Sequence, residues 1–395
     1  MLKRLCLKNT VSNEMEKGDM ETARIVRLNL KYKDEFRGCL IGGAIGDALG
    51  YPVEFLRARD IFARYGNNGV TKYILSENGQ ALISDDTQMT LFTATGLLLG
   101  KTRAMTRGIS GEPYSYTGFA YKTWYGMQIG NKRQEYEYSW LADVPEMGAS
   151  RAPGNTCMSV IGSNQYGNVD EPINNSKGCG GIMRVAPVGL YFNRPNGRSY
   201  SLKDVWMQSA NVAALTHGHE LGWLPAAVLA HIVNRICYSG EDILDVIRQA
   251  QDILREHYHD RKHSKDLIKI IDDAISLTMN DKSDLENIKT LGEGWVAEET
   301  LAIAIYCSIK YQDDFSKALS VAVSHDGDSD STGAVTGNIL GTLYGYENIP
   351  DKWKENLECK DVILEVADDL CHDCQISEYG PWDSTWERKY IENRR

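Results

Sequence analysis

Two short clusters of acidic and hydroxyl residues offer the most distinctive chemistry in this chain. The first is Ser-Asp-Asp-Thr at 84–87, and the second is His-Asp-Gly-Asp-Ser-Asp-Ser-Thr at 325–332. Asp and Ser are good helix N-caps, so one acid in each place needs no further role. The additional Asp residues exceed that need, and packed together they repel one another unless a cation lies between them. Oxygen ligands without His or Cys suit Mg²⁺, Ca²⁺ or Mn²⁺, so the two clusters predict a metal site.

Weaker motifs leave other chemistries open. The second cluster also matches part of an EF-hand loop, although Gly337 stands where the glutamate at position twelve belongs. Residues 292–297 match the dinucleotide pattern GxGxxA but follow no buried strand. The histidines of THGH at 216–219 leave a Ser–His–Asp triad open by spacing, although no GxSxG elbow occurs. The glycine-rich segment 177–184 is either an ordinary turn or a backbone cradle for a phosphate.

Two segments with a glycine at every fourth position must bring the acidic clusters together. These glycines are Gly38, Gly42, Gly46 and Gly50 in the first segment and Gly333, Gly337, Gly341 and Gly345 in the second. Residues four apart share one face of a helix. Each interior Gly costs about 1 kcal/mol relative to Ala, so a stripe of them needs a compensating gain. We expect two helices that pack at very short distance and thereby gather the loops at their ends.

The rest of the chain reads as one large, nearly all-α domain. Amphipathic periodicity predicts helices at 85–100, 204–216, 222–238, 241–257, 265–280, 296–310 and 314–324. The best strand signal is GVTKYIL at 69–75. Residues 107–184 show little periodicity and are interpreted as a long loop-bearing segment.

The N-terminus differs from the body of the chain. Residues 1–33 are charge-rich, and a short helix from Glu14 to Leu30 is possible there. They form either a loosely ordered terminus or an arm that docks on a partner. We therefore divide the chain into an N-terminal extension, 1–33, and a domain, 34–395.

Composition excludes several classes of protein. The 395 residues carry 43 Lys+Arg and 54 Asp+Glu, a formal net charge of −11, which argues against a nucleic-acid partner. The nearly apolar runs are too short to span a membrane, and the N-terminus lacks the apolar core of a secretory signal. Nine scattered cysteines suit a reducing cytoplasm. The CHDC segment at 371–374 has no second Cys/His pair nearby, so zinc is not expected there.

Six segments follow one another in a characteristic order over residues 34–390. They are RGCLIGGAIGDALGYPVEF at 37–55, SDDTQMT at 84–90, GCGGIMRVAPVGL at 178–190, THGH at 216–219, GEGWVAEETLAIAIY at 292–306 and DGDSDSTGAVTGNILGTLYG at 326–345. Each alone is a weak signal, but six in register are specific. Together they resemble the ADP-ribosylglycohydrolase family, of the dinitrogenase-reductase-activating glycohydrolase type.

The resemblance implies a fold and a site. The fold is a compact, orthogonally packed helical bundle with a cleft for two Mg²⁺ or Mn²⁺ ions, and the activity is hydrolysis of the bond between ADP-ribose and a protein side chain. By motif position the metal ligands are Ser84, Asp85, Asp86, Asp328, Asp330 and Ser331. Glu54, with Asp85 and Asp86, is assigned to catalysis, Glu54 as the base or water-positioning group. The substrate contacts are Ser176, Gly178, Cys179, Gly180 and His217.

The resemblance has departures and leaves the substrate open. Ser84 stands where the family usually has Thr, and Ser331 likewise follows Asp330 in place of Thr; both keep a hydroxyl. Arginine linkage is the first expectation, with serine linkage, ADP-ribose esters or poly-ADP-ribose as alternatives. Some bacterial relatives resemble antidotes, so residues 1–33 are also a candidate module that occludes an ADP-ribosyltransferase toxin. A non-catalytic relative is disfavoured by the retained acids.

Overall fold

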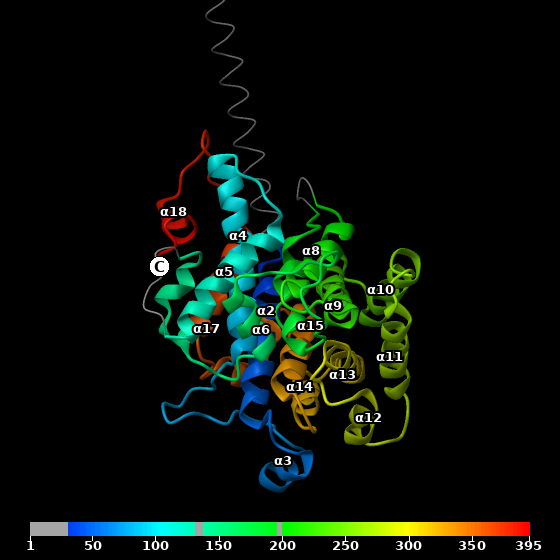
Figure 1. The fold of residues 1–395 in the computed structure, drawn as a ribbon. Coiled ribbons are helices and arrows are strands. Elements are labelled where there is room, and N and C mark those ends of the chain that lie inside the picture. Colours follow the sequence, from blue (N-terminus) through cyan, green and yellow to red (C-terminus); the bar gives the residue numbers. More distant parts are fainter. Residues whose placement is uncertain (1–30, 131–136, 196–199) are drawn as a thin grey trace, which may run out of the picture.

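The computed structural model describes residues 31–130, 137–195 and 200–395, and helices dominate all three ranges (Figure 1). No strand forms within the described residues, where β-pairing is limited to isolated bridges between Ala81 and Leu357 and between Gly178 and Val296. The all-α prediction is confirmed.

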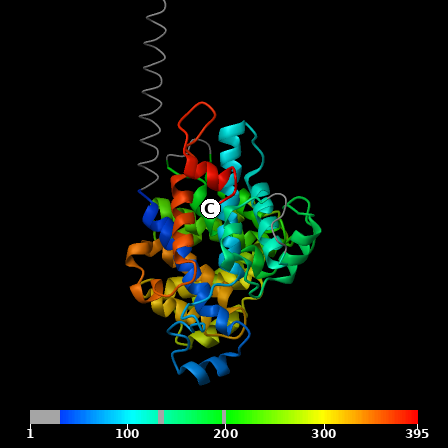
Figure 2. The ribbon, with the colours of Figure 1, turned by 90° about the vertical axis from the view of Figure 1, so that its left-hand side faces the viewer.

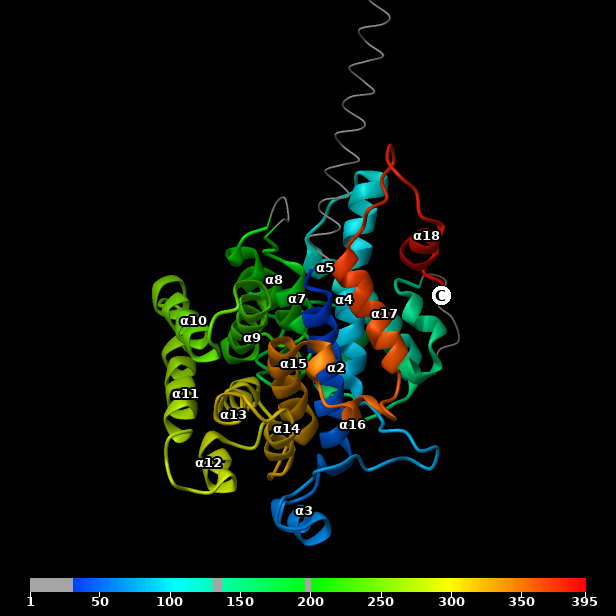
Figure 3. The ribbon, with the colours of Figure 1, turned by 180° about the vertical axis from the view of Figure 1, so that it is seen from behind.

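Two central helices, α2 (Lys33–Gly50) and α15 (Ser329–Asn348), lie side by side through the molecule (Figures 1 and 3). Their glycine faces meet so closely that a Cβ atom on Gly42 would collide with the carbonyl oxygen of Gly337, and one on Gly46 with that of Gly333. Asn338 of α15 donates a 2.9 Å hydrogen bond to a backbone carbonyl of α2. The predicted close packing is confirmed, and it brings the C-terminal end of α2 against the first turn of α15.

The other helices surround this pair. Helices α4 (Asp85–Arg107) and α17 (Lys360–His372) pack on α2, while α9 (Glu220–Ser239), α13 (Ala297–Lys310) and α14 (Phe315–Val323) pack on α15. Helices α10 (Ile243–His257), α11 (Ser264–Leu277) and α12 (Asp284–Leu291) form the flank opposite α18 (Ser384–Tyr390), as Figures 1 and 3 show. In Figure 2 the side of α18, in red, faces the viewer. The remaining helices are η1 (Tyr51–Val53), α3 (Ala58–Tyr65), α5 (Pro113–Gln128), η2 (Trp140–Asp143), η3 (Pro145–Gly148), α6 (Asn155–Ser163), η4 (Cys179–Gly181), α7 (Ala186–Tyr191), α8 (Leu202–Ala214) and α16 (Asp351–Lys354).

The seven helices predicted from periodicity all form, but the strand predicted at 69–75 is wrong. That segment is a loop, and Val70 donates its backbone N–H to the Ser324 hydroxyl, 2.9 Å away. The Tyr73 hydroxyl bonds to the carbonyl of Trp353 at 2.7 Å. Its apolar residues therefore anchor a loop to the helical body, because no neighbouring strand within the described residues pairs with it.

The interpretation of residues 107–184 as loop is wrong in part, since α5 and α6 lie there. Proline starts α5 at its first position, and the helix buries Tyr116, Tyr121 and Trp124. Tyrosine and threonine on the buried face blur the contrast between apolar and polar positions, so the helical period was hidden.

The described residues show where the first helix of the domain begins and whether any helix could span a membrane. Helix α2 begins at Lys33, whereas the helix considered at 14–30 lies outside the described residues. The division into 1–33 and 34–395 stays a prediction. No single described helix is long and apolar enough to cross a bilayer; one pair bent by 98°, Lys33–Val53 with Ala58–Tyr65, passes on length and composition. Within that pair, most residues of α2 are buried in the bundle.

Candidate active site

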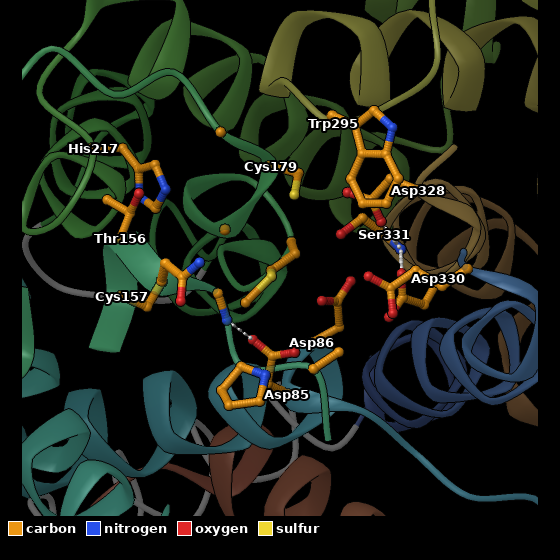
Figure 4. A pocket seen from close by; sticks show the side chains of 18 of the residues that line it. Asp85, Asp86, Thr156, Cys157, Cys179, His217, Trp295, Asp328, Asp330 and Ser331 are labelled. Atoms are coloured by element: carbon orange, nitrogen blue, oxygen red, sulfur yellow. Dashed lines mark hydrogen bonds between the residues drawn. The ribbon is translucent and has the colours of Figure 1, made fainter. Parts of the chain in front are cut away.

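A cavity of about 410 Å³ opens where the C-terminal end of α2 meets the first turns of α4 and α15 (Figure 4). The acids of α4 and α15 face each other across it, with His217 on the far wall. Its lining residues are Glu54, Phe55, Asp85, Asp86, Ala152, Pro153, Gly154, Asn155, Thr156, Cys157, Gly178, Cys179, Gly180, Met183, His217, Trp295, Asp328, Asp330 and Ser331.

Asp47, a fully buried acid on α2, holds the first turn of α4 in place. Its carboxylate accepts the backbone N–H groups of Ser84 at 3.0 Å and Thr87 at 3.1 Å, and also the Thr87 hydroxyl. Sequence reasoning assigned no role to Asp47, although an acid inside an apolar, glycine-rich helix was the available signal. Because α2 is fixed against α15, this contact also fixes α4 relative to α15.

The first turn of α4 directs two acids into the cavity. Ser84 caps the helix by accepting the Asp86 backbone N–H at 3.2 Å. Asp85 accepts the backbone N–H of Gly154 at 3.4 Å, while the Asp86 Oδ2 atom is buried and has no hydrogen-bond partner among the described residues. Ser84 itself is buried and does not line the cavity.

The first turn of α15 faces these acids. Asp328 caps the helix by accepting the Ser331 backbone N–H at 3.3 Å, and Asp330 accepts the same group at 3.0 Å. Carboxylate oxygens of Glu54, Asp328 and Asp330 all lie within 4.8 Å of one another, a spacing that one metal ion can span. Glu54, which sequence reasoning treated as a base, thus lies close enough to be a ligand as well.

The acids in this cleft are unfavourable as free carboxylates. Burial, and then the charge of Asp330, raises the pKa of Glu54 to about 9 and that of Asp47 to about 7. The pKa values of Asp85, Asp86 and Asp328 are raised for the same two reasons. Glu54 Oε2 and Asp86 Oδ2 are both buried without a protein partner in the described part of the chain. Unpartnered oxygens among mutually repelling acids fit a hard divalent cation, so the donor set matches the group that the resemblance implies.

The glycine-rich turn at 177–181 forms the opposite wall and is tied down by residues 292–297. Cys179 donates its N–H to the Trp295 carbonyl at 3.2 Å, and Ala297 donates to the Lys177 carbonyl at 2.9 Å. The Lys177 and Glu298 side chains form an ion pair. The segment that matches GxGxxA therefore links α12 to α13 and braces the wall of the cleft, with no strand before it.

Two aromatic rings mark one rim of the cavity. Phe55 and Trp295 stack with ring centroids 5.8 Å apart and ring planes 20° apart. Phe55 is 73% exposed and Trp295 38%, which is unusual for large apolar side chains beside a cleft. Next to them Arg57 and Glu293 form an exposed ion pair at 3.2 Å. Sequence reasoning did not assign either aromatic residue to the site, although both lie in the quoted segments.

The structure gathers most of the expected site residues in one place. Glu54, Asp85, Asp86, Asp328, Asp330, Ser331, Gly178, Cys179, Gly180 and His217 all line the cavity. Ser176 lies in an adjoining hollow that shares Asn155 and Thr156 with the cavity, and its hydroxyl is 3.3 Å from that of Thr156. The segment 152–157, which leads into α6 and forms its first turn, was not anticipated, because no motif marks it.

Two alternative metal sites are not supported. Gly337, at the twelfth position of the EF-hand pattern counted from Asp326, lies within α15, has no side chain to bind a cation, and packs against Gly42 of α2. Within the described residues, the only group of three or more His, Cys, Asp or Glu side chains close enough to share an ion is that of Glu54, Asp328 and Asp330, so Cys371–Cys374 offers none.

Comparisons with known proteins agree with this geometry. The family model described as ADP-ribosylglycohydrolase matches residues 28–379. The ADP-ribosylarginine hydrolase Tri1 of Pseudomonas putida is 24% identical over 345 residues, covering 85% of this chain and 78% of that protein. The ADP-ribosyl-dinitrogen reductase glycohydrolase of Rhodospirillum rubrum is 24% identical over 334 residues, covering 83% and 91%.

Two further comparisons bear on extent and fold. The human ADP-ribosylhydrolase ARH3 is 26% identical over 209 residues, and this alignment covers 46% of the chain and about half, 54%, of that protein. A solved ADP-ribosylglycohydrolase-related protein complex superposes with a TM-score of 0.59 at 21% identity, covering 86% of this chain and 98% of that one. This structural similarity shows that the chain and the solved protein share a fold.

Proposed function

Because the chain belongs to the ADP-ribosylglycohydrolase family, we propose that it hydrolyses the bond between ADP-ribose and an arginine side chain of a modified protein. The observation that carries this proposal is the convergence of Glu54, Asp328 and Asp330 at the floor of a cavity that His217 and a glycine-rich turn also line. We further propose that the acidic cleft holds two Mg²⁺ or Mn²⁺ ions, with Ser84, Asp85, Asp86, Asp328, Asp330 and Ser331 as the candidate ligands.

The reaction breaks a glycosidic bond at the anomeric carbon of the ribose, through a transition state with oxocarbenium character. The family is metal-dependent. A bound divalent cation supplies positive charge that orients the sugar and favours deprotonation of water. Glu54 has one carboxylate oxygen without a protein partner among the described residues, so it can hold a water molecule at the cleft floor. It could accept the proton of that water once a bound cation offset the charge of the neighbouring acids, because those charges and burial otherwise raise its pKa to about 9.

The far wall provides the contacts for the rest of the substrate. The turn at 178–180 offers the Gly180 backbone N–H for the pyrophosphate, since those of Gly178 and Cys179 are bonded to the Ser176 hydroxyl and the Trp295 carbonyl. His217 offers a ring nitrogen for a ribose or phosphate oxygen. These uncharged donors matter because the surrounding protein is acidic and would otherwise repel the two phosphates.

The rim favours a cationic target side chain. A guanidinium group is attracted to the face of an aromatic ring, especially Trp. The exposed Phe55–Trp295 pair and the buried acids behind it present ring faces and negative charge to whatever side chain carries the ADP-ribose. Serine linkage would gain nothing from either feature, and on that ground we place arginine first.

The decisive assay measures release of ADP-ribose from an arginine-ADP-ribosylated protein with Mg²⁺, with Mn²⁺ and with EDTA. We expect release with either cation and none with EDTA. A serine-ADP-ribosylated peptide of matched sequence is the comparison, and faster release from it would overturn the arginine assignment. If neither substrate is cleaved by folded protein with metal present, the hydrolase proposal itself is wrong.

The toxin-binding alternative for residues 1–33 stays a prediction, because residues 1–30 lie outside the described part of the structure. Deletion of residues 1–30 should abolish transferase binding and leave hydrolysis intact if that segment is the binding arm.

A further inference from the structure

His217 presents its two ring nitrogens to different surroundings. The side chain is 2% exposed and lies in the wall of the cavity, as Figure 4 shows. Nδ1 lies 2.8 Å from the hydroxyl oxygen of Thr216. Nε2 has no protein hydrogen-bond partner among the described residues and lies on the side of Gly178 and Gly180, whose added Cβ atoms would each stand 3.4 Å from it. Which nitrogen carries the proton therefore decides whether His217 donates or accepts in the cleft.

A buried arginine acts on the same threonine. Arg184 is fully buried, and its Nη2 donates to the Thr216 hydroxyl at 2.6 Å and to the Val212 carbonyl at 3.1 Å. Its guanidinium stacks over the Tyr121 ring, 4.5 Å from the centroid. Within the described residues it bonds to no carboxylate, which is unusual for a buried charge. A guanidinium has donors only, so the contact with Thr216 has one possible direction.

Because Arg184 can only donate to the Thr216 hydroxyl, the acceptor of the hydroxyl's own proton can be inferred. With Arg184 donating to the Thr216 oxygen, the single hydroxyl proton is free to be donated elsewhere. Two acceptors are at hand: Nδ1 of His217 and the sulfur of Cys157, which also lies beside the hydroxyl. An imidazole nitrogen is a much stronger acceptor than a thiol sulfur. The proton therefore goes to Nδ1, and Nδ1 must then be unprotonated.

We propose that Arg184 and Thr216 are positioning residues that hold His217 as the Nε2–H tautomer, so that the ring is a permanent hydrogen-bond donor to the cleft. Burial, together with the positive charge of Arg184, lowers the pKa of His217 to about 3, which is consistent with a neutral ring. Only the identity of the acceptor, a ribose or phosphate oxygen of ADP-ribose, rests on the proposed function. An Nδ1–H tautomer would instead present a lone pair, which repels a phosphate oxygen and can only accept from a ribose hydroxyl.

The glycine-rich turn supports the same arrangement. A Cβ atom on Gly180 would stand 3.0 Å from Cε1 of His217 and 3.0 Å from the sulfur of Cys157. The backbone of the turn thus packs directly on the imidazole and restricts its rotation, while the hydrogen bond from Thr216 sets its protonation.

The tautomer is directly observable by ¹H–¹⁵N NMR on the full chain labelled with ¹⁵N-histidine, without substrate. The eight histidines are distinguished by comparison with His217→Gln. We expect the His217 signals of an Nε2–H ring in the wild type and in Thr216→Ser, which keeps the hydroxyl. Thr216→Val, of almost the same shape, should lose that signature. An Nδ1–H ring in the wild type overturns the inference whatever the enzyme's activity.

Binding of free ADP-ribose, measured by calorimetry, tests the consequence. Loss of one well-oriented hydrogen bond predicts about tenfold weaker binding for Thr216→Val, and a change within about twofold for Thr216→Ser. Equal loss in both variants would mean that the methyl group matters and the hydroxyl does not, and would overturn the inference. If the wild type does not bind ADP-ribose at all, the proposed function fails while the tautomer result still stands.

Discussion

At the scale of single residues, Asp330 is the acid whose charge acts on the other acids of the cleft. Its charge raises the pKa values of Asp47, Glu54, Asp85, Asp86 and Asp328 alike. A residue so placed is either a repulsive centre that destabilises the fold or the main anchor of a cation.

Replacement of Asp330 by Asn should therefore weaken Mn²⁺ binding by about 10- to 100-fold and reduce turnover accordingly, since a neutral amide is a poor substitute for a carboxylate ligand. Calorimetric titration with Mn²⁺ measures the effect. The matched control is Asp326→Asn in the same loop. Among the described residues the Asp326 carboxylate accepts the backbone N–H of Ala58 at 2.9 Å and no other hydrogen bond, and an asparagine can accept this one too. Wild-type turnover by the Asp330 variant would remove it from the metal site.

The aromatic rim supports a second prediction at this scale. Trp295→Ala should raise KM for an arginine-linked substrate by about 2- to 30-fold, the range of a cation–π contact, and leave the affinity for free ADP-ribose unchanged. Trp382→Ala is the control, because that tryptophan is 52% exposed and does not line the cavity. An equal loss of ADP-ribose affinity would assign the pair to the nucleotide rather than to the target side chain.

Many of the residues in the cleft could be predicted from the sequence, but not all of them. The acids at 85–86 and 328–330 repeat in motifs whose charge already demands a cation. Phe55 and Trp295 could not be identified, because an aromatic residue signals only burial until its exposure is known. The role of Asp47 could not be predicted either, because it depends on contact with the first turn of α4, 37 residues further along the chain.

At the scale of elements, the packing of α2 on α15 carries the third prediction. Gly42→Ala should destabilise the protein by about 1–3 kcal/mol or more, because the new Cβ would meet backbone that cannot move aside. Gly118→Ala in α5 is the control, and we expect it to stabilise the protein. Its Cβ would meet only side chains at 3.6 Å or beyond, and alanine is favoured over glycine in a helix by about 1 kcal/mol. Urea unfolding measures both, and destabilisation of equal size would contradict the close approach.

The elements that were predicted well and those that were not differ in one physical respect. The glycine stripes and the seven amphipathic helices follow from a period that side-chain type reveals directly. Helix α5 and the loop at 69–75 do not follow from such a period, because their conformation depends on the elements that pack against them. Val70 bonds to Ser324, more than 250 positions away, in place of a neighbouring strand.

At the scale of the whole molecule, buried histidines make stability depend on pH. Burial lowers the pKa of His231 to about 4, and its Nδ1 accepts the indole N–H of Trp206 at 3.2 Å. Between pH 6.5 and 4 the unfolded chain binds a proton that the folded chain does not, so this group's contribution is complete above pH 6.5 and is lost as the pH falls.

His231→Gln keeps an acceptor for Trp206 and removes this proton. Its stability relative to the wild type should improve by about 1.4 kcal/mol per pH unit on going from pH 6.5 to 4, as measured by urea unfolding across that range. A wild-type and variant difference that stays constant with pH would mean that His231 is protonated in the fold.

The pairing of α2 with α15 also has a consequence for synthesis. The two helices that frame the cleft are separated by nearly 300 residues of chain, and at about 5–20 residues per second a ribosome needs roughly 15–60 s to pass from one to the other. Throughout that interval the bare glycine face of α2 has no partner, and the acids at 85–86 wait for those at 328–330. A chain that ends before α15 therefore lacks the acids at 328–330 and has no complete cleft.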